Sequence, residues 1–250
     1  MDNKQIIEIC MLAGKIMLES GAETHRVEDT MNRIAEAYGC KDVQSFAMPT
    51  GVHFSIQESD ASHFRRVSSR ATDLHKIADV NEISRDIARG LIPLEQAREK
   101  LREVERSRQT FTKLIQIIAA ALVSGSFTIM FGGTWPDFLP SMITGGVAYG
   151  FMFWVVYLID TRFIADFFAS IIIGLLAYLS IQMGFGHSLD KIIIGAVMPL
   201  VPGLPITNAV RDLLAGHLVA GVSKGVEAGL TAVAIGAGVA VMFGFVELFT

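Results

Sequence analysis

Residues 198–212 read Met-Pro-Leu-Val-Pro-Gly-Leu-Pro-Ile-Thr-Asn-Ala-Val-Arg-Asp. This stretch lies in a strongly apolar half of the chain, yet it holds three prolines, at positions 199, 202 and 205, followed by Asn208, Arg211 and Asp212. Each proline removes a backbone donor and clashes with the preceding helical turn. In hydrocarbon, such a break is stable only where protein or a water-filled cavity satisfies the freed backbone groups. The stretch therefore predicts a proline-broken membrane helix, from which many transporters build a substrate site.

Charged residues divide the chain of 250 residues into two parts. Residues 1–113 hold 17 of the 21 Lys and Arg residues and 18 of the 25 Asp and Glu residues. We therefore predict an α+β cytoplasmic domain over residues 1–110 and a transmembrane domain over residues 111–250. The net charge of −4 is small and spread along the chain, which does not indicate a nucleic-acid-binding protein. The first residues lack a signal peptide, so we expect the N-terminus to stay cytoplasmic.

Hydrophobic periodicity predicts the elements of the N-terminal domain. Apolar side chains recur at helical spacing in four segments: 6–18, 27–38, 74–88 and 94–104. Two short strands are predicted at Val43–Ala47 and Val52–Ile56, joined by a turn at Met48–Gly51, with a third strand at 64–68. Ser20 and Glu23 form a capping signal for the start of the second helix.

The N-terminal domain shows no motif for catalysis or cofactor binding. Its histidines lack the spacing of a metalloprotease helix, and there is no glycine-rich phosphate loop. Cys10 and Cys40 have no CxxC partner, so we expect no metal, no cofactor and no disulfide framework, and we expect both to pack as small apolar side chains. Glu23, Arg26 and Glu28 are candidates either for a solvated helix face or for a surface that contacts or gates the membrane domain.

Five spans are predicted in the transmembrane domain, and a sixth remains open if 213–222 inserts fully. They lie near residues 114–134, 138–159, 163–184, 190–207 and 226–249. Basic residues are dense before the first span, and the short connections carry Arg162, Arg211 and Lys224 on one side against Lys191 on the other. This asymmetry predicts a cytoplasmic N-terminus.

Small residues recur every fourth position in the last span: Ala228, Ala232, Gly236, Ala240 and Gly244. A second row comprises Gly221, Gly225 and Gly229, and Gly146 and Gly150 repeat the spacing in the second span. Such rows let helix backbones approach closely in lipid, so we interpret them as packing surfaces. A span with two small faces needs two neighbours, which suggests a partner protein or a homo-oligomer.

Asn208, Arg211 and Asp212 lie at i, i+3 and i+4 and share one face of a helix. Adjacent Arg211 and Asp212 cannot simply pair with each other, so each needs a partner from elsewhere or a ligand. Ionisable groups inside a span are functional candidates, and Asp166 and Glu227 join this set. The alternatives are that Arg211 only fixes orientation, that Asp166 only pairs with Arg162, and that Glu227 only favours a helix N-terminus.

The segment Pro202–His217, followed by Gly221, Glu227 and Ala228, resembles the signature of the threonine/serine exporter family. Ser20–Glu28 and Pro49–Gly51 resemble motifs of the family's cytoplasmic domain. At His217 the family commonly has an aspartate, so any proton-binding or amine-binding role of that acid is in question here.

Family members with both halves on one chain have about ten spans, so this chain is similar to the larger subunit of the split, two-chain form. The resemblance implies a bacterial inner-membrane exporter of threonine and serine or of succinate, coupled to protons, with a small all-membrane partner subunit. Arg211, Asn208 and the backbone at Pro202, Gly203 and Pro205 would bind the substrate, with Asp212 beside them. Asp166, Glu227 and His217 are the proton-coupling candidates. A competing hypothesis is a membrane-anchored sensor or hydrolase that acts through the cytoplasmic domain.

Overall fold

The structure is a computed structural model that describes residues 3–56, 62–107 and 110–249. The chain divides into two compact units. Met1–Thr110 and Leu204–Val226 form the first unit, and Phe111–Gly203 and Glu227–Thr250 form the second. The boundary therefore falls inside the proline-rich stretch, and its residues from Leu204 onward belong to the same unit as the N-terminal residues.

The first unit contains an antiparallel sheet with the strand order β1-β2-β3. The strands are β1 (Val43–Met48), β2 (Gly51–Ile56) and β3 (His63–Arg66). Met48 pairs with Gly51, so the tight turn at Pro49 and Thr50 sets the register of the first hairpin. All three strands were predicted, although β3 begins and ends slightly earlier than expected. Val52, Phe54 and Ile56 alternate along β2 and face the core, as a half-buried strand requires.

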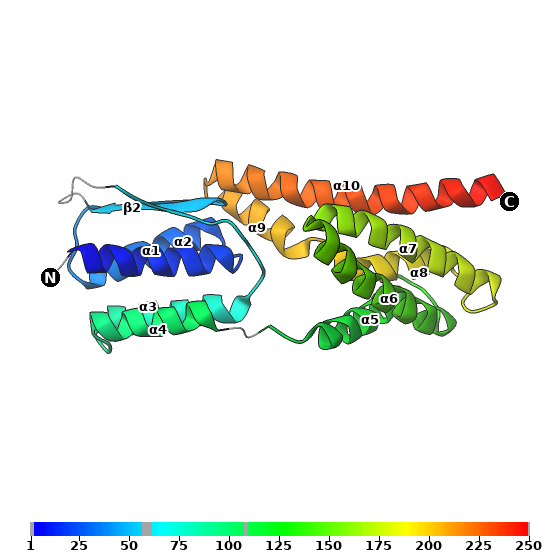
Figure 1. Cartoon of the computed structure of the whole chain (residues 1–250), viewed down its shortest axis with the longest axis horizontal. Coiled ribbons are helices and arrows are strands. Elements are labelled where there is room, and N and C mark those ends of the chain that lie inside the picture. The colour runs from blue at the N-terminus through cyan, green and yellow to red at the C-terminus, as the bar shows by residue number, and fades with distance from the viewer. Residues whose placement is uncertain (1–2, 57–61, 108–109, 250) are drawn as a thin grey trace. The chain divides into compact units, whose positions relative to one another are not determined.

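Residues of α1 (Asn3–Glu19), α2 (Thr24–Ala37), α3 (Leu74–Ala88) and α4 (Leu94–Arg106) build this core together with the sheet. Helix α1 is buried on nearly all sides because it packs against α2, α3, α4 and β2 (Figure 1). The core contains Ile9, Met17, Met31, Ile34 and Leu101, all fully buried. Cys10 is buried and Cys40 is half-buried, and they form no disulfide.

The second unit contains the predicted membrane helices. They are α5 (Lys113–Met130), α6 (Trp135–Ile159), α7 (Arg162–Gln182) and α8 (Leu189–Val197), followed by a 3-10 turn, η1 (Met198–Leu200). Helix α9 (Gly203–Leu214) begins at the end of the second unit and continues in the first, whereas α10 (Leu218–Phe249) begins in the first and continues in the second (Figure 1). Among the described residues, α5, α6, α7 and α10 are long and apolar enough to cross a membrane. The count reaches five if α8, η1 and α9 together form one span.

The helical run is interrupted within the opening stretch. Helix α8 ends at Val197, the chain is not helical at Val201 and Pro202, and α9 begins at Gly203. Whether the two helices form a single broken span stays a prediction. Residues 213–222 do not form a span of their own, because α9 ends at Leu214 and α10 begins at Leu218.

Close contacts fix α8 against its neighbours in the second unit. A Cβ atom at Gly145 would lie 1.9 Å from Ser124 Oγ, and one at Gly195 would lie 1.9 Å from Thr128 Oγ1. The Thr128 hydroxyl is 2.6 Å from that of Ser141, so buried hydroxyls and glycines occupy the crossing of α5, α6 and α8. Small and hydroxyl-bearing residues of this kind allow close packing of membrane helices.

Asp137 joins the loops at one end of the second unit. Its Oδ1 accepts hydrogen bonds from the backbone N–H groups of His187, at 2.6 Å, and Ser188, at 3.0 Å. Its Oδ2 accepts bonds from the backbone N–H and the hydroxyl of Thr134, at 2.9 and 2.7 Å. This carboxylate therefore caps α6 and also holds the connection between α7 and α8.

Candidate functional site: a buried polar cluster in the first unit

The turn between α1 and α2 depends on a glycine in the left-handed backbone conformation. Gly21 adopts φ +82°, and the N–H groups of Gly21 and Ala22 donate to the carbonyls of Leu18 and Met17, at 3.2 and 3.0 Å. This is the Schellman arrangement, in which a left-handed residue closes a helix. The turn leaves the carbonyls of Gly21 and Ala22, and the first N–H of α2, available to other elements.

Helix α9 ends in the same way. Gly216 adopts φ +86°, and the N–H groups of Gly216 and His217 donate to Leu213 and Asp212, at 3.1 and 2.8 Å. The chain then enters α10, which carries Lys224 in its second turn. Gly221 lets these two helices approach, because a Cβ there would lie 2.9 Å from the carbonyl oxygen of Ala209.

Asp212 is the centre of the polar cluster, and it is 0% exposed. Its Oδ1 accepts a hydrogen bond of 2.8 Å from the Thr24 N–H, and its Oδ2 accepts one of 2.9 Å from the Thr24 hydroxyl. Lys224 Nζ donates to Asp212 Oδ2 at 2.7 Å. Asp212 thus supplies from α9 the carboxylate that stabilises the N-terminus of α2. The capping signal predicted at Ser20 and Glu23 is wrong, since the Glu23 side chain makes no cap hydrogen bond.

Lys224 is 8% exposed and binds three oxygens of the cluster. Besides Asp212, its Nζ donates to the carbonyl of Ala22 at 3.2 Å and to the Thr24 hydroxyl at 3.3 Å. A buried charge requires both an opposite charge and hydrogen bonds, and this ammonium has both. In the sequence, Lys224 indicated only the orientation in the membrane. Lys224 lies between Gly221 and Gly225, and these small residues, which allow close packing of helices, were the sign in the sequence that it could be buried.

Arg211 and Asn208 bind the same turn from the edge of the cluster. An Nη atom of Arg211 donates to Oε1 of Glu23, and Asn208 Nδ2 donates to the carbonyl of Gly21 at 2.8 Å. The Arg211 side chain is 60% exposed, whereas that of Glu23 is 8% exposed. The guanidinium is therefore anchored at one edge and remains open to solvent.

Two histidines lie beside the carboxylates of the cluster. His25 Nε2 lies 3.6 Å from Glu23 Oε2, and His25 Nδ1 lies 3.9 Å from Asp212 Oδ1. His217 Nδ1 lies 3.6 Å from Glu28 Oε1, which also accepts the Ala47 N–H at 2.8 Å. Arg26 Nε lies 4.0 Å from Glu23 Oε2.

The structure therefore brings together most of the residues singled out in the sequence. The first unit unites two groups that are far apart in the chain: Asn208, Arg211, Asp212 and His217 with Glu23, Arg26 and Glu28. Pro205 also belongs to this unit, whereas Pro202, Gly203, Asp166 and Glu227 belong to the second. Sequence reasoning missed Thr24, Lys224 and the turn carbonyls as members of the cluster.

Asp166 lies in α7 and is 0% exposed. Neither of its carboxylate oxygens has a hydrogen-bond partner within the described part of the chain. Arg162 Nε lies 3.8 Å from its Oδ2, but the Arg162 side chain is largely exposed. Glu227 is exposed on α10, and its backbone carbonyl accepts the hydroxyl of Thr231 at 3.2 Å.

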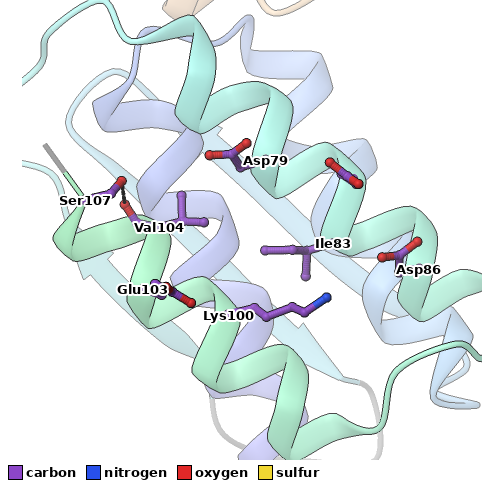
Figure 2. A pocket seen from close by; sticks show the side chains of 8 residues that line it. Asp79, Ile83, Asp86, Lys100, Glu103, Val104 and Ser107 are labelled. Carbon is purple, nitrogen blue, oxygen red and sulfur yellow. Dashed lines mark hydrogen bonds between the residues drawn. The ribbon is translucent and has the colours of Figure 1, made fainter. Parts of the chain in front are cut away.

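A separate groove of about 350 Å³ lies between α3 and α4. Figure 2 shows Lys100 extending beside Ile83, with the carboxylates of Asp79, Asp86 and Glu103 around it. The hydroxyl of Ser107 at the rim donates to the carbonyl of Val104 at 2.8 Å. The residues that line this groove include no nucleophile with an adjacent base, so the groove does not favour the hydrolase hypothesis.

The number and apolar surface of the long helices define a multi-pass membrane protein. Its polar cluster includes the segment that resembles the exporter signature. Residues 8–246 match the model of the putative threonine/serine exporter family. The chain belongs to this family, which confirms the resemblance seen in the sequence.

Individual relatives are distant. The chain is 20% identical to a probable threonine/serine exporter of Mycobacterium tuberculosis over 88% of its own length, and spans 42% of that relative. It is 22% identical to proteins named probable succinate transporter subunit YjjP of Klebsiella aerogenes and Escherichia coli, covering 95% and 94% of this chain and 93% of each relative. No solved structure matches the chain. These relatives are named exporters or transporters, which supports a transporter rather than an enzyme.

Proposed function

We propose that this chain is one subunit of a bacterial inner-membrane secondary exporter of small carboxylates, either threonine and serine or a dicarboxylate such as succinate. The observation that carries the proposal is the Arg211 guanidinium, which is anchored at a buried polar cluster but 60% exposed. A guanidinium binds a carboxylate through paired, charge-assisted hydrogen bonds. The family and the names of the relatives support the same class of transported molecule.

Neighbouring groups would complete the binding site. Asn208, whose amide already reaches Gly21, would orient the substrate together with the backbone at Pro205. Asp212 would act mainly as a positioning residue, because both of its oxygens accept bonds from Thr24 and Lys224. It fixes the helix turn that carries Arg211.

Export would be coupled to protons through Asp166, with His217 and Glu227 as further candidates. Asp166 is buried without a hydrogen-bond donor in the described residues, and a charge at such a position in a span costs free energy. Its proton would be exchanged during the transport cycle. His217 Nδ1 lies 3.6 Å from Glu28 Oε1, so this imidazole has a carboxylate beside it.

A partner subunit would complete the transporter, with the N-terminus of this chain in the cytoplasm. Two relatives of similar length are named transporter subunits. Glycines 229, 236 and 244 on α10 support this, because a Cβ at each would meet nothing within 4 Å in the described structure. These glycines, of which Gly236 and Gly244 belong to the first predicted row and Gly229 to the second, would pack against the small all-membrane subunit or against a second copy of this chain.

The test is the efflux of labelled threonine and succinate from membrane vesicles that contain this chain and its partner. We expect Arg211→Ala to lower the flux at least about tenfold, since a charge-assisted hydrogen bond is worth about 1.5–3 kcal/mol. Arg33→Ala is the matched control, because Arg33 pairs with Asp29 on the surface of α2. Unchanged flux in Arg211→Ala, with normal insertion, would overturn the assignment.

A further inference from the structure

The partner of Arg211 in this structure is itself a carboxylate. Glu23 Oε1 accepts a hydrogen bond from the guanidinium that, under the proposed function, binds the carboxylate of the substrate. The two carboxylates would make the same charge-assisted contact with the same donor. They therefore cannot occupy it in the same way at the same time.

The position of Glu23 is fixed by the backbone. Glu23 is the N-cap residue of α2, with φ −65° and ψ 138°, but its side chain does not cap the helix. Asp212 satisfies the Thr24 N–H instead. The Glu23 carboxylate is thus freed from capping and reaches Arg211, although the two residues are 188 positions apart in the sequence.

Glu23 also has alternative partners close by. Its Oε2 lies 3.6 Å from His25 Nε2 and 4.0 Å from Arg26 Nε. If Glu23 leaves Arg211, these two groups on its own helix remain beside its carboxylate. The carboxylate is then not left buried without a partner, which would cost much more free energy.

We propose that Glu23 is a built-in competitor of the substrate at Arg211. This inference rests on the proposed function of Arg211 and adds how access to it is regulated. In the resting arrangement Glu23 occupies the guanidinium, and a substrate carboxylate binds only as Glu23 moves to Arg26 and His25. The competitor raises the substrate concentration needed for export, so that the transporter stays idle while the substrate is scarce.

The size of the effect follows from the fraction of time that Arg211 is available. If Glu23 occupies the guanidinium for about 70–90% of the time, the apparent affinity for substrate is reduced about 3- to 10-fold. Removing the negative charge of Glu23 should restore that affinity. Removing Arg26 should act in the opposite direction, because Glu23 then loses an alternative partner.

The experiment measures KM and Vmax for efflux of labelled threonine and, separately, labelled succinate, from vesicles that contain this chain and its partner. We expect Glu23→Gln to lower KM about 3- to 10-fold for both substrates. Glu23→Asp keeps the charge but shortens the side chain, and should give an intermediate KM. Arg26→Ala should raise KM. Asp29→Asn is the control, because Asp29 lies on the exposed surface of α2 and pairs only within that helix in its described ion pair.

Three outcomes would overturn the inference. An unchanged KM in Glu23→Gln, while Arg211→Ala still lowers the flux at least about tenfold, refutes the competitor and leaves the proposed function intact. A higher KM for threonine with no such change for succinate would make Glu23 a ligand of the substrate ammonium group. Normal flux in Arg211→Ala would remove the proposed function and the competitor together. Unfolding midpoints of each variant in detergent separate these results from misfolding.

Discussion

Asp212 in the first unit and Asp166 in the second are both fully buried, but their surroundings differ. Asp212 accepts hydrogen bonds from the Thr24 backbone, the Thr24 hydroxyl and Lys224. Neither oxygen of Asp166 has a hydrogen-bond partner in the described residues, and its ion partner Arg162 lies 3.8 Å away at the surface. The same side chain is therefore fully compensated in one place and poorly compensated in the other.

The difference teaches that burial alone does not assign a role to a carboxylate. A buried charge with an opposite charge and several donors is part of the structure, and removing one partner leaves the other uncompensated. A buried carboxylate without donors contributes little to stability, so its presence calls for another explanation. Measurements of stability can separate these two situations.

The largest effect on the free energy of unfolding is expected at the ion pair of Asp212 and Lys224. Lys224→Ala should lower the free energy of unfolding by about 3–5 kcal/mol, because it leaves the buried Asp212 carboxylate without its counter-ion. Asp212→Asn should have a similar effect, since it leaves the buried Lys224 ammonium without one. The measurement is the denaturant midpoint of the purified protein in detergent. The double variant Asp212→Asn with Lys224→Ala should lose less than the sum, since the two residues interact directly.

Asp29→Asn provides the matched control for this prediction. Asp29 forms an exposed ion pair with Arg33 on α2, and such pairs contribute about 0–1 kcal/mol. If Lys224→Ala were as mild as Asp29→Asn, the cluster would not hold the first unit together, and the contrast with Asp166 would disappear.

Much of the N-terminal fold could be predicted from the sequence. The helices over 74–88 and 94–104 and the hairpin at 43–56 follow from local periodicity and turn residues, and the structure has them at these positions. The spacing of Asn208, Arg211 and Asp212 also predicted their common helix face. It predicted that the two charges need partners from elsewhere, and Glu23, Thr24 and Lys224 are those partners.

The identity of those partners could not be predicted, for a physical reason. Glu23 and Arg211 are separated by 188 positions, and periodicity reports only on neighbours within a few turns. The small-residue rows show the same limit. Gly146 packs against Ala121, as its row suggested, whereas the close approaches at Gly145 and Gly195 came from outside the predicted rows. The spacing of small residues shows that a neighbouring helix can pack closely against a span. It does not show which face of the span that neighbour contacts.

A smaller effect on the free energy of unfolding is expected at Cys10, where a thiolate charge would be buried in the first unit. Burial, with a smaller contribution from Cys40, raises the pKa of the Cys10 thiol far above its ordinary value. Above pH of about 8.5 the unfolded chain releases this proton while the folded chain retains it. The contribution to stability is therefore fully present below that pH and is lost as the pH rises toward the folded-state pKa. The slope approaches about 1.4 kcal/mol per pH unit.

The measurement compares the free energy of unfolding of the unmodified chain and Cys10→Ala between pH 8 and 10. The groups that titrate in both proteins cancel in the difference of slopes. We expect the slope to be shallower in Cys10→Ala, whatever its stability at pH 8. Equal slopes would mean that water reaches Cys10 in the folded chain and that its thiol is not buried as the structure has it.

The smallest effect on stability is expected at Asp166, where the effect on transport should be large. Asp166→Asn removes a charge that has no described hydrogen-bond donor and whose ion partner, Arg162, is largely exposed, so the free energy of unfolding should change by less than about 1 kcal/mol. If Asp166 carries the coupling proton, the same variant should abolish the pH dependence of efflux in vesicles, because asparagine cannot exchange a proton. A destabilisation as large as that of Lys224→Ala would make Asp166 a structural residue like Asp212. Normal pH dependence with normal stability would instead transfer the coupling role to His217 or Glu227.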